Sequence, residues 1–286
     1  MSTKGAIFFA YNNSELDYIK LAKLSATSIK QHLNLDCTLI TDVDVNSDVF
    51  DNIIVEEIEY KQNTRSFYDT PQTKFTSQFN NLNKHKVFEL SPYDQTILFD
   101  VDFLVNNAIL NLAFDVNSPI QLYRNAQTLK NTEPYHNLDK HLSINGIPMY
   151  WSTVIYFDKS PMSKMFFDMW AHVKENYDYY QMLYKFPEGL YRTDYAVSIS
   201  VHVLKGFKEY TDDLISELPA SPMKYMAYKD DIAKVDKQGI TFFINDNHND
   251  SKNILTYCEK ENLHLMNKRA IMRHYNKLME LYVPNI

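Results

Sequence analysis

The chain has 286 residues, of which 45% are hydrophobic, and a formal net charge of −7. It can bury a large core, and its acidic balance argues against a surface that binds polyanions over its whole extent. It contains no run of about 18 apolar residues and no secretory signal pattern, so we expect a cytoplasmic protein without a membrane span. Cys37 and Cys258 are too few for a disulfide framework, and neither belongs to a zinc-binding cluster.

The N-terminal part of the chain alternates apolar strands with helices. Residues 5–11 are typical of a buried strand, and the spacing of apolar residues predicts a helix from Ser14 to His32. Further strands are expected at 37–41, 52–58 and 96–99, with a helix from Phe79 to Leu90 before the last of them. The polar stretch 61–81 contains turn residues but no clear period, so we expect a loop there.

The rest of the chain continues this alternation. Strands are expected at 118–124, 150–157 and 240–244, and helices at Pro161–Tyr180, after Asp194 and at Asn267–Tyr282. Residues 125–149 are polar and are expected to form a loop over an open site. The order of elements predicts an α/β/α sandwich with a mostly parallel central sheet.

Two carboxylates directly follow the apolar strand at 96–99. Asp100 and Asp102 are two residues apart, so on extended chain they project to one face and can offer oxygen ligands to a divalent cation. In open α/β sheets, ligands bind at the carboxyl ends of the strands, where this pair lies. Apolar residues on both sides make uncompensated charge costly, which favours a cation site over a strand-end turn with capping carboxylates.

The D-x-D pattern is short, and Asp42-Val43-Asp44 repeats it in the same sequence. That second pair runs into Asp, Asn and Ser residues, a composition typical of a solvated loop. Asp42 still follows a predicted strand and can line a ligand pocket at its end. The chain has neither of the two common glycine-rich phosphate-binding motifs, so a bound phosphate would need another anchor.

Several stretches, taken in order, resemble the glycogenin-like group of GT-A-fold glycosyltransferases, often numbered family 8. They are AIFFAYNNSELDYIKLAKLSATSIKQH, NKHKVFELSPYDQTILFDVDFLV, YWSTVIYFDKSPMSKMFFDMW, YRTDYAVSIS and NLHLMNKRA. The resemblance covers most of residues 5 to 270. It implies a GT-A fold, a Rossmann-like α/β/α sandwich with a mixed, mostly parallel sheet and a C-terminal helix. It also implies transfer of a sugar from a nucleotide-sugar, UDP-linked, to an acceptor with retention of anomeric configuration.

The resemblance implies roles for individual residues. Asp100, Asp102 and His264 would hold a Mn²⁺ or Mg²⁺ ion, and the single imidazole favours Mn²⁺. Asp194 would be the catalytic group beside the sugar. Together with Asp42 at the end of its own strand, the residues that would bind the nucleotide or its diphosphate are Ala10, Tyr11, Lys84, Lys86, Val101 and Lys268. Those that would bind the sugar are Trp151, Ser152, Thr153 and Asp194.

We therefore expect a single GT-A-like domain over residues 1–286. Its nucleotide-binding half would be 1–105, which ends in the D-x-D pair. The sugar- and acceptor-binding half would be 106–266, and a C-terminal helix would occupy 267–286.

The sequence departs from the family pattern at three places. The family's N-x-G is Trp151-Ser152-Thr153, its D-Q is Asp194-Tyr195, and its H-x-x-G-x-x-K is shortened to the run from His264 to Lys268. These departures bear on the donor sugar and on the stereochemistry. They leave open a sugar- or nucleotide-binding module without turnover. A nucleotide-sugar pyrophosphorylase is a second alternative, although AYNNSEL stands where those enzymes have a glycine-rich loop.

Ordinary structural roles remain open for several of these residues. His264 lies between two leucines, where a strand histidine is commonly satisfied by one hydrogen bond, and Asp194 stands where a helix N-cap is expected. Arg269, Arg273 and Lys277 recur every four residues, which is typical of a solvated helix face. The acceptor can be a glycan, a protein or a modified nucleobase.

Overall fold

The computed structural model describes residues 2–58, 63–69, 72–130, 140–143, 146–187, 189–208, 215–245 and 253–283. Within these ranges, no helix has both the length and the apolar composition that crossing a bilayer requires. Of the loop predicted at 125–149, residues 131–139 and 144–145 lie outside the described residues.

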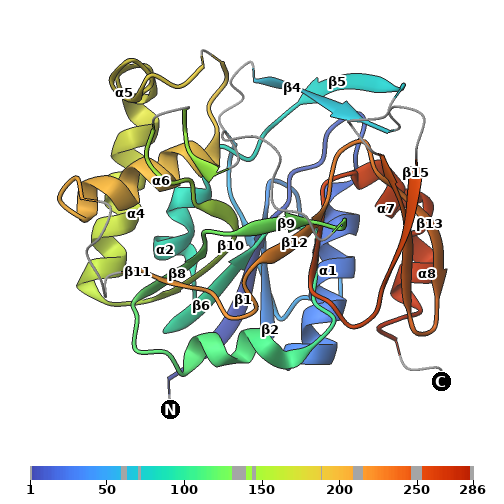
Figure 1. The fold of residues 1–286 in the computed structure, drawn as a ribbon. Helices are drawn as coiled ribbons and strands as arrows, with labels where there is room; N and C mark the ends of the chain where they lie inside the picture. Colours follow the sequence, from blue (N-terminus) through green and yellow to red (C-terminus); the bar gives the residue numbers. More distant parts are fainter. Residues whose placement is uncertain are drawn as a thin grey trace.

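A seven-stranded sheet forms the centre of the fold (Figure 1). Its strand order is β11 (Ile215–Glu217), β8 (Ile120–Tyr123), β10 (Trp151–Asp158), β6 (Gln95–Phe99), β1 (Lys4–Phe9), β2 (Asp36–Thr41) and β3 (Asn52–Val55). All neighbouring strands are parallel, except that β10 runs antiparallel to β6 and β8. The prediction of a mixed, mostly parallel sheet is confirmed. Because β10 runs the other way, its first residues lie beside the last residue of β6.

Helices lie on either side of this sheet. Helix α1 (Tyr18–Leu33) packs against β1 and β2, whereas α6 (Thr193–Leu204) packs against β10 and against α4 (Pro161–Glu175). Figure 1 shows the sheet between α1 and the group that contains α2 (Val87–Leu90), α4 and α6. Leu21 of α1 and Trp170 of α4 are fully buried. The predicted α/β/α layering is confirmed.

The first helix begins later than predicted because polar side chains hold the preceding turn. The Asn13 side chain accepts hydrogen bonds from the amides of Glu15 and Leu16. Asp17 then caps the helix by accepting from the Lys20 amide at 2.8 Å. Helix α1 therefore begins at Tyr18 rather than at Ser14.

Three other predicted helices are shorter or divided. The helix predicted at Pro161–Tyr180 is α4 followed by α5 (Tyr177–Tyr184), and the two meet at Asn176, whose side chain donates to the His172 carbonyl. The C-terminal helix is divided at His274 into α7 (Lys268–Arg273) and α8 (Tyr275–Met279). The helix predicted at Phe79–Leu90 is reduced to a 3-10 turn, η1 (Lys84–Lys86), and α2.

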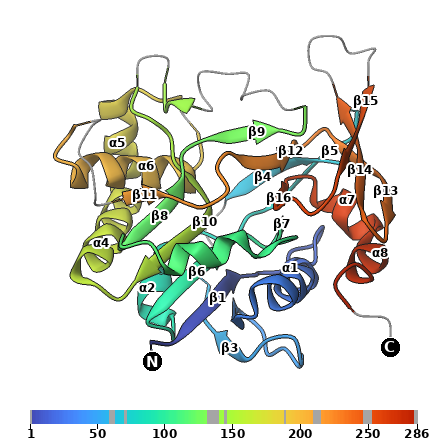
Figure 2. The ribbon, with the colours of Figure 1, turned by 60° about the horizontal axis from the view of Figure 1, so that its bottom comes forward.

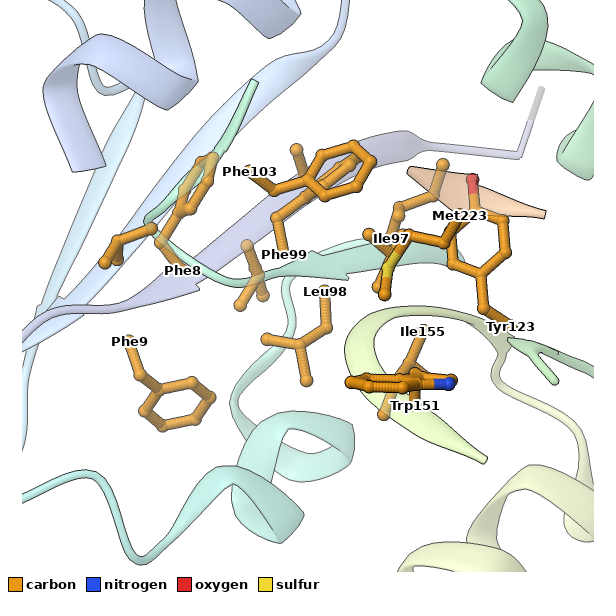
Figure 3. Packing of buried hydrophobic residues seen from close by; sticks show 14 of the residues in the cluster. Phe8, Phe9, Ile97, Leu98, Phe99, Phe103, Tyr123, Trp151, Ile155 and Met223 are labelled. Atoms are coloured by element: carbon orange, nitrogen blue, oxygen red, sulfur yellow. The ribbon is translucent and has the colours of Figure 1, made fainter. Parts of the chain in front are cut away.

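Aromatic side chains fill the centre of the sheet. Phe8 of β1 stacks on Phe99 of β6 with ring centroids 6.0 Å apart, and Phe99 lies 5.8 Å from Phe103. All three are buried, and Figure 3 shows them near Trp151 and Ile155 of β10. The D-x-D pair falls between Phe99 and Phe103. The core therefore fixes both ends of the turn that carries the two carboxylates.

A four-stranded sheet joins the C-terminal third of the chain to this turn. Its order is β7 (Phe103–Leu104), β16 (Leu263–Leu265), β12 (Met223–Met226) and β9 (Ala126–Thr128). β7 directly follows Asp102 and pairs antiparallel with β16, so that His264 is the partner of Phe103. Between β7 and β8 the chain forms a 3-10 helix, η2 (Ala108–Phe114), which the sequence did not predict.

The polar stretch 61–81, predicted as a loop, contains a hairpin. β4 (Thr64–Tyr68) pairs antiparallel with β5 (Lys74–Gln78), and Phe67 lies opposite Phe75 with their rings stacked 5.4 Å apart. A cross-strand aromatic pair of this kind stabilises two short strands whose sequence is otherwise polar. Figure 1 shows the hairpin on the side of the molecule toward which β1 and β6 run.

A further antiparallel sheet consists of β13 (Asp231–Asp236), β14 (Gly239–Asn245) and β15 (Asn253–Cys258). It lies against α7 and α8 (Figure 2). β14 contains the strand predicted at 240–244. Cys37 and Cys258 are both buried and free, as expected for a chain without a disulfide framework.

We expect Gly5→Ala to destabilise the protein. A methyl group at Gly5 would lie 2.3 Å from ring atoms of Tyr93, and the backbone there is fixed by pairing with both β2 and β6. Overpacking of this kind costs about 1–3 kcal/mol of unfolding free energy. Urea unfolding measures it. The matched control is Gly189→Ala, because nothing lies within 4 Å of a methyl group there. Equal unfolding free energies for the two variants would contradict the packing described for β1.

Candidate active site

The turn between β6 and β7 presents Asp100 and Asp102 at the carboxyl edge of the central sheet. The Asp100 amide donates to the Thr153 carbonyl of β10 at 2.7 Å, and the Phe103 amide donates to the Asp100 carbonyl at 3.1 Å. Val101 lies between them and is buried. Asp102 is only 2% exposed, so its charge requires a partner inside the protein.

His264 reaches this turn through the pairing of β16 with β7. Its Nε2 atom lies 3.4 Å from Asp102 Oδ1. Potential ligand atoms of Asp100, Asp102 and His264 all lie within 4.8 Å of one another. Two carboxylates and one imidazole are a donor set that suits Mn²⁺ or Mg²⁺. The residues present therefore fit the metal that the sequence predicts.

Each aspartate is paired with a lysine. Lys84 Nζ donates to Asp100 Oδ1, and Lys268 Nζ lies 2.5 Å from Asp102 Oδ2. Lys84 is 5% exposed and also lies 3.4 Å from the Ser152 carbonyl. Lys268 is the first residue of α7, whose N-cap Asn267 is fully buried. The two lysine ammonium groups thus contact carboxylate oxygens that a divalent ion would also bind.

The surroundings shift the pKa values of the two aspartates in opposite directions. Burial raises the pKa of Asp100, which Lys84 lowers and the neighbouring Asp102 carboxylate raises further. Burial would also raise the pKa of Asp102, but Lys268 and His264 outweigh it and hold that pKa well below its usual range. The pKa of Lys268 is raised because Asp102 outweighs the effect of burial. Asp102 is therefore the carboxylate that keeps its charge.

Asp194 connects α6 to the first residues of β10. It lies inside α6, where the N-cap residue is Arg192, so the predicted role as N-cap is wrong. Its Oδ1 atom accepts from the Ser152 amide at 2.9 Å and from the Ser152 hydroxyl at 2.7 Å. Because the Ser152 carbonyl faces Lys84, these contacts link Asp194 to the Asp100 side of the cluster.

Trp151, Ser152 and Thr153, the other residues predicted to bind the sugar, are buried at the start of β10. Thr153 Oγ1 lies 3.5 Å from His264 Nδ1, and Thr153 is 2% exposed. The Trp151 ring lies 5.8 Å from the ring of Tyr225, and its indole Nε1 has no hydrogen-bond partner within the described ranges. The hydroxyl groups of Ser152 and Thr153 are thus directed to Asp194 and His264.

The residues predicted to contact the nucleotide form a second group at the ends of β1, β2 and β3. Ala10 and Tyr11 are buried, and the pKa of Tyr11 is raised by burial and by the nearby carboxylates of Glu56 and Asp42. Lys86 pairs with Glu56 at 3.1 Å, whereas Lys84 pairs with Asp100. The two lysines of the 3-10 turn therefore belong to different groups. Asp44, the second carboxylate of the other D-x-D, is exposed.

Three site residues were not predicted from the sequence. The Tyr18 hydroxyl is buried and has no hydrogen-bond partner among the described residues. Burial is the largest effect on its pKa and raises it, and Lys268, Asp102 and Arg65 are close enough to shift it as well. Arg65 projects from the hairpin, and Arg192 precedes α6. An unpaired buried donor costs about 1–3 kcal/mol. Tyr18 and Arg65 reach the site only through long-range packing, so no local pattern distinguishes them, whereas Arg192 lies two residues before Asp194 in the sequence.

Of the three basic residues that recur every four positions in 269–277, Arg269 and Arg273 form ion pairs, and Lys277 is exposed. Arg269 pairs with Glu15 and lies 4.0 Å from the Phe75 ring centroid. Arg273 pairs with Asp69 and with Asp231, the latter at 2.9 Å. These contacts tie α7 to the hairpin and to β13.

No protein-family model and no curated protein sequence matches this chain. Among solved structures it is similar to the glycosyltransferase GlyE of Streptococcus pneumoniae TIGR4, at 14% identity over 76% of this chain and with a TM-score of 0.41. The chain spans 45% of the length of GlyE. It is also similar to the galactosyltransferase LgtC in complex with donor and acceptor sugar analogues, at 12% identity, covering 74% of this chain and 72% of LgtC, with a TM-score of 0.46. Mouse xyloside xylosyltransferase 1 shares 12% identity, with 79% of this chain and 88% of that protein covered and a TM-score of 0.45. These similarities concern the fold alone.

Proposed function

We propose that this protein is a metal-dependent glycosyltransferase that moves a sugar from a UDP-linked donor to an acceptor. The observation that carries the proposal is the convergence of Asp100, Asp102 and His264 with Lys84 and Lys268 at the carboxyl edge of the sheet. The family resemblance of the sequence supports the same reaction.

Asp100, Asp102 and His264 would hold the metal, Mn²⁺ in preference to Mg²⁺ because of the imidazole. When bound, a divalent ion stabilises the negative charge that grows on a departing diphosphate. The protein must hold the ion in a dry, fixed site, and the low exposure of Asp102 and His264, 2% and 7%, meets that need.

Lys84 and Lys268 would serve the diphosphate. Both ammonium groups are now paired with the carboxylates that the metal needs. With Asp100 and Asp102 holding the metal, Lys84 and Lys268 would be free to donate hydrogen bonds to phosphate oxygens. Hydrogen bonds between charged groups are the strong class, so this exchange couples binding of the metal to binding of the nucleotide. The group of Ala10, Tyr11, Asp42 and Lys86 would lie against the base, with Val101 at the D-x-D turn.

Asp194 would act at the sugar, beside the residues from Trp151 to Thr153. Its carboxylate is fixed by both the amide and the hydroxyl of Ser152. A side chain held by two hydrogen bonds loses little freedom when the substrate arrives, which favours the reaction. Ser152 is thus a positioning residue in this proposal, and Asp194 the catalytic one.

The metal site predicts a loss of Mn²⁺ affinity in Asp102→Asn. The substitution removes the charge that both Lys268 and the metal require, so affinity should fall at least about tenfold. The electron paramagnetic resonance signal of free Mn²⁺ measures binding without any need for turnover. Asp44→Asn is the matched control, because Asp44 belongs to the other D-x-D and is exposed. The site assignment fails if the two variants bind Mn²⁺ equally well.

Lys268→Met separates the two roles of this lysine. Without nucleotide, Mn²⁺ should bind more tightly than to the wild type, because its competitor for Asp102 Oδ2 is gone. With Mn²⁺ saturating, UDP should bind roughly ten- to a hundredfold more weakly, as expected for the loss of a charged hydrogen bond worth about 1.5–3 kcal/mol. Isothermal titration calorimetry gives both affinities, and the exposed Lys277→Met is the control. Unchanged UDP affinity would remove Lys268 from the diphosphate site.

Turnover tests the reaction itself. Wild-type protein with Mn²⁺ should release UDP from at least one UDP-sugar, and Asp194→Asn should lower the rate by about 10²–10⁴ while UDP binding remains. Asp168→Asn, an exposed change on α4, is the control. UDP binding without release from any donor would instead identify a nucleotide-binding module. Formation of UTP from pyrophosphate and a UDP-sugar would identify a pyrophosphorylase.

A further inference from the structure

Two arginines from distant parts of the chain lie at the segment that leads into α6 and Asp194. Arg65 lies on β4 of the hairpin, and its Nη2 atom donates to the Tyr191 carbonyl at 2.6 Å across a separation of 126 residues. Arg192 is the next residue after Tyr191. The two arginines and Asp194 are close enough that Asp194 raises the pKa of Arg65 while Arg192 lowers it.

Arg65 lacks a carboxylate partner in the described part of the chain. Besides the Tyr191 carbonyl, its guanidinium lies 3.6 Å from the centroid of the Phe79 ring. The Arg65 side chain is half-buried, and burial is the largest effect on its pKa, which it lowers. A partly desolvated guanidinium without a carboxylate contact gains free energy when an anion binds.

Arg192 is oriented by Tyr195 and paired with Asp194 at the limit of salt-bridge distance. Its Nη1 atom lies 3.2 Å from the Tyr195 hydroxyl, and the guanidinium lies 4.5 Å from the centroid of the Tyr195 ring. The nearest carboxylate oxygen, Asp194 Oδ2, is 3.9 Å away, while Oδ1 is engaged by Ser152. The side chain of Arg192 is 51% exposed, so it faces the solvent side of the site.

Hydrogen bonds from α4 and α5 hold the segment Tyr191–Arg192, which Arg65 contacts. The Trp170 indole donates to the Tyr191 hydroxyl at 2.8 Å, and the Arg192 amide donates to the Tyr177 hydroxyl at 3.0 Å. Both contacts come from the helices α4 and α5, which pack on each other. Arg192 therefore projects from a fixed segment, and Arg65 is held to the same segment by its hydrogen bond to the Tyr191 carbonyl, so a ligand loses little ordering entropy there.

An independent observation points to a ligand here. Tyr18 is 8% exposed, and its hydroxyl has no hydrogen-bond partner among the residues that the structure describes. Burial raises its pKa most, and Lys268, Asp102 and Arg65 are all close enough to shift it. The hydroxyl is therefore a hydrogen-bond donor that a ligand oxygen can still satisfy. Among the charged groups that shift the pKa of Arg65, Asp194 is the one carboxylate. Its Oδ1 atom already accepts a hydrogen bond from the Ser152 amide.

We propose that Arg65 and Arg192 form an anion subsite that binds a carboxylate or phosphate group of the acceptor. The inference rests on the proposed function, since Asp194 marks the sugar side of the site only if sugar transfer occurs there. Planar guanidinium groups match oxyanions with paired hydrogen bonds. The exposure of Arg192 assigns the anion to the acceptor, which enters from solvent, rather than to the donor held between the D-x-D turn and β10.

Matched pairs of probes test this subsite with Mn²⁺ and UDP already bound. The pairs are methyl β-D-glucuronide with methyl β-D-glucoside, and glucose 6-phosphate with glucose, each measured by calorimetric titration. In the wild type, at least one charged probe should bind about tenfold or more tightly than its neutral partner. Arg192→Gln and Arg65→Gln should abolish that preference, whereas Arg192→Lys should keep part of it. Lys4→Gln, at the opposite end of β1, should change nothing.

The first titration in the series, Mn²⁺ and UDP alone, reports on the proposed function separately. If UDP binds but charged and neutral probes bind equally, or neither binds detectably, the anion subsite is wrong and the nucleotide site stands. The same conclusion follows if the preference survives in both glutamine variants. A preference for UDP-glucuronic acid over UDP-glucose that depends on Arg192, without any preference among the acceptor probes, would move the anion to the donor and overturn the assignment.

Discussion

The site depends on two buried ion pairs, Lys84 with Asp100 and Lys268 with Asp102. Lys84 and Asp102 are buried, and burying a charge costs nearly as much free energy as pairing it returns, so such pairs seldom persist for stability alone. Here Lys268 keeps Asp102 charged, and Lys84 holds Asp100 in place. The surrounding core, with Phe99 and Phe103, makes the turn rigid. The two lysines pair with the carboxylates, and in the proposed function they would pair with the diphosphate once a metal is bound.

One reversed strand explains how these groups come together. If β10 were parallel to β6, its first residues would lie at the opposite edge of the sheet. Because it is antiparallel, the Thr153 carbonyl accepts from the Asp100 amide and the Ser152 side chain reaches Asp194. The turn that carries Asp100 and the start of β10 are therefore connected through backbone pairing, and Asp194 of α6 joins them through the amide and the hydroxyl of Ser152.

The sequence predicted those features that are encoded locally. The apolar run before Asp100 predicted a buried strand with carboxylates at its end, and polar neighbours marked Asp44 as solvated. It did not predict features that depend on contacts far along the chain. The hairpin is held by the Phe67–Phe75 pair, which has no local period, and Arg65 reaches Tyr191 only after folding. Likewise, the sequence could not tell which lysine of the 3-10 turn faces Asp100, because that depends on the direction of each side chain around the turn.

The connection of α7 to the hairpin has a consequence for how the protein is made. Asp102 waits for His264 and Lys268, which are synthesised long after it, and the buried Asn267 side chain bonds the Asp69 carbonyl of the hairpin as α7 docks. Contacts between such distant segments form slowly because the intervening chain must first be ordered. On the ribosome, Asp102 therefore stays without these partners until nearly the whole described chain has emerged, whereas Lys84, the partner of Asp100, is synthesised before the turn. In the proposed function, a metal held by Asp102 and His264 would bind only after β16 has paired with β7.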